Sequence, residues 1–154
     1  MRIRAASVHD TRRLAELRWD FRTADAPAAT SHEAFLVRCE AWMRGALGPH
    51  GRWQAWVAER DGVTVGNIWL QLIEKIPNPV VEPESHAYLS NLYVVPEARG
   101  GVGQALLDAA LAHCHAVHAH SVILWPTEGS RTLYARAGFA PSRGILARSE
   151  PRSP

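Results

Sequence analysis

The sequence has little cysteine, and this excludes two kinds of small protein at once. Only Cys39 and Cys114 occur among 154 residues, and they stand in unlike contexts. A disulfide framework and a paired CxxC metal motif are therefore both excluded, and a reducing compartment suits the two thiols.

Long apolar runs and a strong net charge are also missing. No stretch reaches the length of a membrane span, and MRIRAASVHD at the start lacks the apolar core of a signal peptide. We therefore expect a cytoplasmic protein with no membrane partner. The formal net charge of +2 is too small to indicate nucleic acid as a partner, although it suits a phosphorylated small ligand.

What remains is the composition of an ordinary globular protein. Hydrophobic residues make up 47% of the chain and charged residues 21%, which shows no bias toward disorder or fibre. The length suits a single hydrophobic core. We expect one domain over residues 1–148 and a frayed tail over residues 149–154.

Two helices are expected in the first third of the chain, after a short strand at residues 3–5. The first helix carries apolar side chains at helical spacing, including Leu14, Leu17 and Phe21. The second should begin at a capping box of Thr30 and Glu33 and end at Gly45 or Gly48. Both helices are expected to cover a sheet.

A β-hairpin should follow the two helices. Strand-like segments at residues 53–59 and 63–73 flank the turn Arg-Asp-Gly, and Gly66 marks a bulge. The next segment, IPNPVVEPE at residues 76–84, has three prolines and no periodicity, which predicts an exposed loop.

The second half of the pattern alternates strand and helix. YLSNLYVV at residues 88–95 is typical of a central strand buried on both faces, and a helix with an apolar face follows it. SVILW at residues 121–125 predicts a short buried strand, and residues 130–137 a short helix. From Phe139 the chain should return to strand, with GILAR as the last candidate. This order favours a mixed sheet in an α/β or α+β fold.

The stretch PEARGGVGQALL, residues 96–107, places three glycines between a strand and a helix. Such backbone freedom is usually accepted where a ligand approaches the main chain, and the amides and dipole of a helix start form an anion site. A Walker A loop is excluded because Gln104 and Ala105 replace its Lys and Ser/Thr. A dinucleotide fingerprint fits poorly because Leu106 takes the place of its third small residue.

LYVVPEARGGVGQALL, followed by SVILWPTEGSRTLYARAGF, resembles the acetyl-CoA-binding half of a GNAT superfamily N-acetyltransferase. In that family a strand ending in V-x-P leads into an Arg/Gln-x-x-Gly-x-Gly/Ala turn. A later helix ends in Tyr-x-x-x-Gly-Phe, which residues 134–139 match. Compared with the usual RGxGxG, one residue is missing after Arg99-Gly100, so strict counting puts Ala98 at the Arg/Gln position.

The resemblance implies a mixed, mostly antiparallel twisted sheet, flanked by helices and splayed at its middle strands. It also implies acetyl-CoA as co-substrate, no metal, and transfer of an acetyl group to a primary amine of a small molecule or peptide by direct attack in a ternary complex. A homodimer is the assembly it suggests. The alternatives are a non-catalytic acyl-CoA-binding or regulatory module, and an interaction domain in which the glycine turn is only structural.

The resemblance further assigns residues to the cofactor. The main chain of Leu92, Tyr93 and Val94 would bind the acetyl carbonyl and the pantetheine arm, so that the cofactor completes the sheet as an added strand. The other expected contacts lie in the glycine turn and near the cofactor's sulfur: Arg99, Gly100, Gly101, Val102, Gly103, Gln104, Thr127 and Ser130.

Tyr134 would be the general acid, because a phenol with a pKa near 10 can protonate a thiolate and is itself protonated at neutral pH. From spacing alone, a packed core tyrosine is an equal alternative. The candidates for passing the amine's proton to water are Glu74, Glu84, His86 and Asn91; we favour Glu84 and Asn91 as catalytic residues, although none is singled out. The run HCHAVHAH invites a metal hypothesis, but no carboxylate completes a ligand set, and a solvated helix end is favoured.

Overall fold

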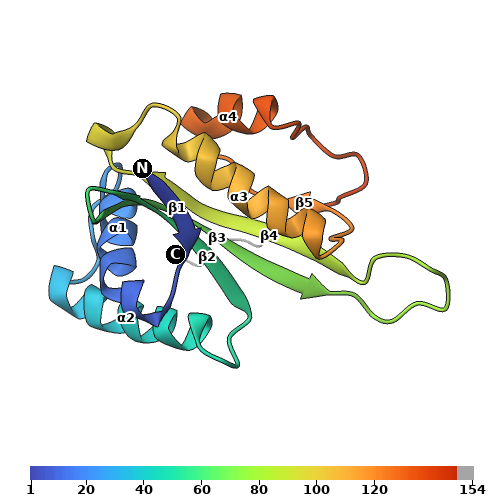
Figure 1. Cartoon of the computed structure of the whole chain (residues 1–154), viewed down its shortest axis with the longest axis horizontal. Coiled ribbons are helices and arrows are strands. Elements are labelled where there is room, and N and C mark those ends of the chain that lie inside the picture. The colour runs from blue at the N-terminus through green and yellow to red at the C-terminus, as the bar shows by residue number, and fades with distance from the viewer. Residues whose placement is uncertain (149–154) are drawn as a thin grey trace.

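A five-stranded sheet, in the order β1-β2-β3-β4-β5, organises the computed structural model of the protein, which describes residues 1–148 (Figure 1). Its strands are β1 (Arg2–Ala5), β2 (Trp53–Arg60), β3 (Val63–Glu74), β4 (Ser85–Val94) and β5 (Val122–Ile123). Neighbouring strands are antiparallel except β4 and β5, which are parallel. The mixed, mostly antiparallel sheet expected from the sequence is confirmed. The predicted tail lies outside the described residues, and the single domain stays a prediction.

The helices cover both faces of this sheet, with α1 and α2 on one side and α3 and α4 on the other (Figure 1). They are α1 (Thr11–Thr23), α2 (His32–Leu47), α3 (Val102–Ala116) and α4 (Arg131–Arg136), with short 3-10 turns η1 (Val8–Asp10), η2 (Pro96–Ala98) and η3 (Glu128–Ser130). Within residues 1–148, no helix combines the length and the apolar character needed to cross a membrane.

Two apolar clusters hold the layers together, one on each face of the sheet. There are two because successive side chains of a strand point to opposite faces. On one face, Leu14 of α1 and Leu36 of α2 pack against Val57 and Trp69. On the other, Leu106 and its neighbours on α3 pack against Ile68, Leu70 and Leu89 of the central strands. Leu14, Leu106 and Ile68 have no exposed surface.

A charged cluster fastens the first strand at the edge of the sheet. The guanidinium of Arg4 donates to Asp10 Oδ1 at 2.7 Å and to Glu59 Oε1 at 2.8 Å. Asp10 also accepts from the Ser7 amide at 2.8 Å in a capping box. The Arg4 hydrogen bond is the main cause that lowers the pKa of Asp10. The cluster therefore joins β1, β2 and η1 at one point.

The second helix begins differently from the expected capping box. Ser31, not Thr30, is the N-cap, and its hydroxyl accepts from the Ala34 amide at 3.3 Å. The expected partner, Glu33, instead forms an ion pair with Arg12 at 3.1 Å. Thr30 and Ser31 are both residue types that favour the N-cap, so the sequence does not distinguish them. In the structure the backbone of Ser31 has the extended conformation that an N-cap needs. The helix ends at Gly48, as expected.

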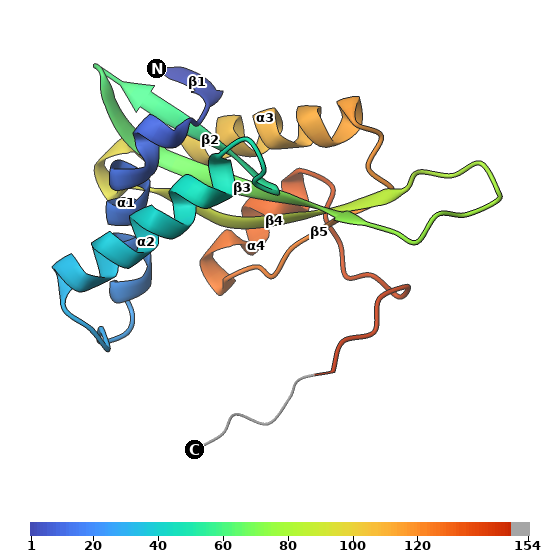
Figure 2. The same cartoon turned by 90° about the horizontal axis from the view of Figure 1, so that it is seen from below.

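The hairpin and its bulge are confirmed. Ala58 pairs with Gly66 and Glu59 with Thr64, so Val65 is the extra residue beside Gly66. The long β3–β4 pair and the loop between them project beyond the rest of the fold (Figure 2).

The C-terminal strands are where the expectation fails. SVILW forms a strand only at Val122–Ile123, and Trp125 is 72% exposed rather than buried. No strand occurs over residues 139–148, so the predicted strand GILAR is wrong. A partner strand of two residues offers too short an edge for a further strand to pair with, and Ile145 lines a cavity instead.

Candidate active site

The sheet opens between β4 and β5. The two strands pair only at Ala87–Val122 and Tyr88–Ile123, after which the chain turns away through residues 124–126. In the part of the chain that the structure describes, residues 89–94 of β4 therefore have a strand neighbour on the β3 side alone. The main-chain donors and acceptors on the other edge have no strand partner among residues 1–148, and this is the kind of edge that an extended segment can pair with.

A bulge in β4 coincides with this opening. Ser90 pairs with Trp69 and Tyr93 with Asn67, so that Asn91 and Leu92 together face Ile68 alone. Asn91 has a φ of +53°, a left-handed conformation that asparagine tolerates better than most residues. Because a bulge bends its strand, β4 turns away from its neighbours where the opening begins. The expected burial on both faces accordingly fails here, since Asn91, Leu92 and Tyr93 are only half-buried.

Two hydrogen bonds hold the bulge in place. Asn91 Nδ2 donates to Oδ1 of the fully buried Asn67 at 3.0 Å, and Asn91 Oδ1 accepts from Arg18 Nη1 at 3.1 Å. Both ends of the Asn91 amide are thus engaged, and a carboxamide neither gains nor loses a proton at neutral pH. Asn91 lies at the site as a residue that fixes the bend.

A pocket of about 240 Å³ lies at the opening. Its walls come from both faces of the sheet, because the gap lets α1 on one face and α4 on the other reach the same space. We call it the splay pocket, lined by Arg18, Phe21, Arg22, Tyr88, Leu89, Ser90, Asn91, Leu92, Trp125, Thr127, Ser130 and Tyr134. Five residues expected from the sequence meet in it: Asn91, Leu92, Thr127, Ser130 and Tyr134.

Tyr134 is held by the end of α4. Gly138, with a φ of +87°, ends the helix and lets the amide of Phe139 donate to the Tyr134 carbonyl at 3.0 Å. The ring of Phe139 then meets the Tyr134 ring edge-on at 5.6 Å between centroids. Burial raises the pKa of the half-buried phenol. Tyr134 is therefore protonated at neutral pH, as a general acid must be.

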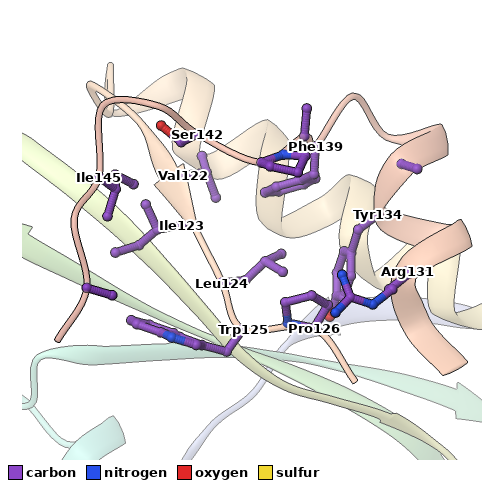
Figure 3. Close-up of a pocket in the computed structure, with 14 residues that line it drawn as sticks. Val122, Ile123, Leu124, Trp125, Pro126, Arg131, Tyr134, Phe139, Ser142 and Ile145 are labelled. Atoms are coloured by element: carbon purple, nitrogen blue, oxygen red, sulfur yellow. The ribbon is translucent and has the colours of Figure 1, made fainter. Parts of the chain in front are cut away.

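A larger cavity of about 490 Å³ lies on the other side of Tyr134 (Figure 3). Figure 3 shows Tyr134 and Arg131 of α4 pointing toward the segment with Leu124 and Pro126, while Phe139 and Ile145 close the cavity from the C-terminal side. Tyr134 and Trp125 line both spaces.

Thr127 and Ser130 form a hydrogen-bonded turn. Thr127 Oγ1 donates to Ser130 Oγ at 3.0 Å, and both the hydroxyl and the amide of Ser130 donate to the Thr127 carbonyl, at 2.9 Å and 3.1 Å. The turn consists of Thr127, the N-cap, and η3, which precedes α4, and it brings Thr127 and Ser130 into the lining of the splay pocket together with Tyr134.

The glycine turn adopts the left-handed backbone for which the sequence supplies glycine. Gly100 has a φ of +107° and Gly101, the N-cap of α3, a φ of +94°. A Cβ on either would meet nothing within 4 Å, so the conformation and not crowding requires glycine. The first intrahelical bond runs from the Ala105 amide to the Gly101 carbonyl at 3.0 Å. The amides of residues 102–104 therefore lack intrahelical partners.

The other residues of this turn differ in what they offer a ligand. Gly103 lies where α3 meets α4, since a Cβ there would come within 3.7 Å of Leu133. The side chain of Gln104 is turned along the helix and donates to Asp108 at 2.8 Å. Arg99 is exposed at the rim, and Val102 is buried, so that Val102 can contribute only its amide.

Glu84 does not come to the splay pocket. It is exposed at the outer end of β4, where its carbonyl accepts from the Lys75 amide at 2.8 Å. At about 3.3 Å per residue, the seven steps to Asn91 span roughly 23 Å. His86 lies near the same outer end and contacts Ser121 at 2.7 Å.

Sequence reasoning gave no role to Arg18, which joins Phe21 and Arg22 in the wall of the pocket that α1 supplies. The sequence does contain a signal for Arg18, because this residue falls on the apolar face of an amphipathic helix. A charged residue on such a face is unusual and indicates a specific role. No group of three or more His, Cys, Asp or Glu residues suited to a metal occurs within residues 1–148.

Comparisons with known proteins agree with this arrangement. A sequence model of the acetyltransferase (GNAT) family matches residues 11–139. A GCN5-related N-acetyltransferase from Ralstonia eutropha JMP134 superposes with a TM-score of 0.79 at 30% identity, over 98% of this chain and 97% of that one. A predicted acetyltransferase from Clostridium acetobutylicum, solved with acetyl-CoA, shares the fold with a TM-score of 0.76 at 18% identity, over 96% and 95% of the two chains.

The chain belongs to the GNAT family of acetyltransferases, a family that uses acetyl-CoA. It is also similar to a mycothiol acetyltransferase from Geodermatophilus obscurus, with 32% identity over 115 residues, which is 71% of this chain and 34% of that protein. The chain thus spans about a third of the length of that relative.

Proposed function

We propose that this protein transfers the acetyl group of acetyl-CoA to a primary amine of a small molecule or peptide, by direct attack of the amine in a ternary complex. The observation that carries the proposal is the splay pocket, in which the unpaired edge of β4 and the protonated Tyr134 meet. The walls of the pocket come from α1 on one face of the sheet and α4 on the other, which suits two substrates that meet in one space. Membership of the GNAT family supports acetyl-CoA as one of them.

The residues present fit this co-substrate. The main chain of Leu92, Tyr93 and Val94 lies on the open edge and would bind the acetyl carbonyl and the pantetheine arm. At the start of α3 the free amides of residues 102–104 suit the diphosphate, and the exposed Arg99 adds a positive charge beside them. Thr127 and Ser130, which line the splay pocket, would lie near the sulfur.

Acetyl-CoA supplies a thioester whose acyl carbon can accept a nucleophile. The acceptor nitrogen forms a bond to that carbon, the carbon–sulfur bond breaks, and the leaving thiolate takes a proton from Tyr134. The lining of the splay pocket contains no carboxylate and no histidine. We therefore assign loss of the amine's proton to water, with Asn91 as a positioning residue. The distance of Glu84 gives it no direct part in this step.

The experiment that tests the acid is Tyr134→Phe, which removes the hydroxyl and keeps the ring against Phe139. Proton transfer by a positioned side chain contributes roughly 10²- to 10⁴-fold, so we expect kcat to fall by that factor while calorimetric affinity for acetyl-CoA is retained. Free thiol release is measured with a panel of amines. Tyr88→Phe is the matched control, because its hydroxyl lies in the same pocket but already donates to Ser90 at 3.3 Å.

Two outcomes would contradict the proposal. Full turnover of Tyr134→Phe at every pH would remove Tyr134 from the reaction. Tight binding of acetyl-CoA by the unaltered protein, without amine-dependent thiol release on any member of the panel, would instead identify a non-catalytic acyl-CoA-binding module.

A further inference from the structure

Two arginines of α1 face the splay pocket. Arg18 is half-buried, with its guanidinium 5.9 Å from the centre of the Phe21 ring and one nitrogen bonded to Asn91. Arg22 lies one helical turn later, at the exposed rim. Because residues four apart share a helix face, both arginines reach the lining of the pocket from the α1 side.

Neither arginine has an acidic partner among residues 1–148. Other arginines do: Arg4 pairs with Asp10 and Glu59, and Arg12 on the same helix pairs with Glu33. The splay pocket likewise has no carboxylate in its lining. It therefore carries two positive charges and no negative one, in a place where like charges at i,i+4 disfavour the helix.

Burial lowers the pKa of Arg18, and the charge of Arg22 lowers it further. A guanidinium is charged at any physiological pH, so the fold holds a half-buried charge whose partners are the neutral Asn91 amide and the Phe21 ring. An oxyanion bound between the two arginines would supply the missing counter-charge, and the planar fork of Arg18 suits a carboxylate or a phosphate.

The diphosphate of acetyl-CoA is a poor candidate for this role. The free amides of α3 lie with α3 and α4 on one face of the sheet, whereas the arginines come from α1 on the opposite face. The volume of about 240 Å³ also favours a small occupant. The anion is then carried by the acceptor.

We propose, on the basis of the proposed function, that the acceptor is a small amine that also bears an oxyanion, which Arg18 and Arg22 bind on the α1 side while its amine faces Tyr134. Arg18 and Arg22 are in this account specificity-determining residues for the acceptor.

The test compares amines that differ only in the anion. The probes are standard amino acids against their amides, and 2-aminoethyl phosphate against ethanolamine, each scored by kcat/KM from thiol release. A hydrogen bond to a charged group corresponds to roughly 10- to 100-fold, so we expect the unaltered protein to favour at least one anionic member by that factor. If the preference occurs in just one of the two pairs, that pair identifies the bound oxyanion as a carboxylate or a phosphate.

Variants then assign that preference to the arginines. Arg22→Gln and Arg18→Gln should each reduce the rate on the anionic member toward that on its neutral partner. Arg22→Gln should leave the affinity for acetyl-CoA unchanged, whereas Arg18→Gln also removes a hydrogen bond that holds the β4 bulge and should weaken acetyl-CoA binding as well. Arg18→Lys keeps the charge but loses the fork, and should recover only part of the preference. Arg12→Gln, on the same helix and outside the pocket, is the matched control and should leave the preference intact. Melting temperatures verify folding, and because Arg22 is exposed, Arg22→Gln keeps the test valid if Arg18→Gln does not fold.

Failure of this inference differs from failure of the proposed function. Equal rates on charged and neutral partners, or a preference that survives both variants, would overturn the role of the arginines while acetylation stands. Variants that weaken acetyl-CoA without changing acceptor preference would assign the arginines to the cofactor and also overturn it. Absence of thiol release with every amine would contradict the proposed function itself.

Discussion

Replacing Gly101 with alanine should destabilise the protein and weaken its binding of acetyl-CoA. Gly101 is the N-cap of α3, with φ +94° and ψ −18°. Its φ lies beyond the window of about +50° to +70° in which residues with a side chain tolerate the left-handed region. An added Cβ would meet nothing within 4 Å, so steric overlap contributes nothing and the whole effect is backbone strain.

The left-handed conformation costs an alanine about 1–2 kcal/mol, and this φ places Gly101 at the upper end, near 2 kcal/mol. For a chain of this size each kcal/mol corresponds to roughly 2–4 °C, so the melting temperature should fall by roughly 4–8 °C. If the turn of the unliganded variant relaxes instead, the binding of acetyl-CoA must restore the strained conformation of the turn so that its amides can contact the ligand. The dissociation constant of acetyl-CoA then rises by up to about 30-fold, and the two losses together stay near 2 kcal/mol.

Circular dichroism melting and calorimetric titration with acetyl-CoA measure the two losses on the same sample. Gly103→Ala is the control from the same turn. Its backbone φ is not in the left-handed region and its Cβ would make ordinary contact with Leu133 at 3.7 Å, so it should gain roughly 0.4–1 kcal/mol of stability. A Gly101→Ala protein that melts and binds acetyl-CoA like its parent would refute the left-handed turn.

Three further predictions follow from the core, the edge of the sheet and the site. Leu106→Ala, in a fully buried position, should lower the free energy of unfolding by about 2–5 kcal/mol in urea titration. Because Arg4 lowers the pKa of Asp10, the carboxylate stabilises the fold above its ordinary pKa near 4, and this contribution is lost as pH falls through the lower folded value. The urea midpoint of Asp10→Asn should therefore depend less on pH between about 2 and 5. Since burial raises the pKa of Tyr134, its ionisation should reduce kcat only above pH about 10; a decline near pH 8 that Tyr134→Phe abolishes would contradict this sign.

Local signals predicted the elements whose periodicity is strong. Three features depend only on residues that are close in the sequence, and all three occur as expected. They are the apolar face of α3, the turn between β2 and β3, and the left-handed glycines before α3. The Tyr-x-x-x-Gly-Phe motif likewise located Tyr134 and the turn that packs Phe139 against it.

What the sequence could not give depends on residues far apart in the chain. The bulge at Asn91 requires Asn67 from β3 and Arg18 from α1, which lie 24 and 73 positions away. GILAR has the composition of a strand but lacks an edge to pair with, and Glu84 is distant because β4 begins earlier than its apolar run suggests. Each of these features depends on which residues are neighbours in space, and local propensity does not encode this.

The hydrogen bond from Arg18 to Asn91 joins the proposed acceptor site to the bend that exposes Leu92. A ligand that draws Arg18 toward itself also acts on the hinge that keeps the opposite half of the pocket open. If binding of one substrate changes the affinity for the other by some factor, thermodynamic linkage requires the second substrate to change the affinity for the first by the same factor. This holds whichever substrate binds first.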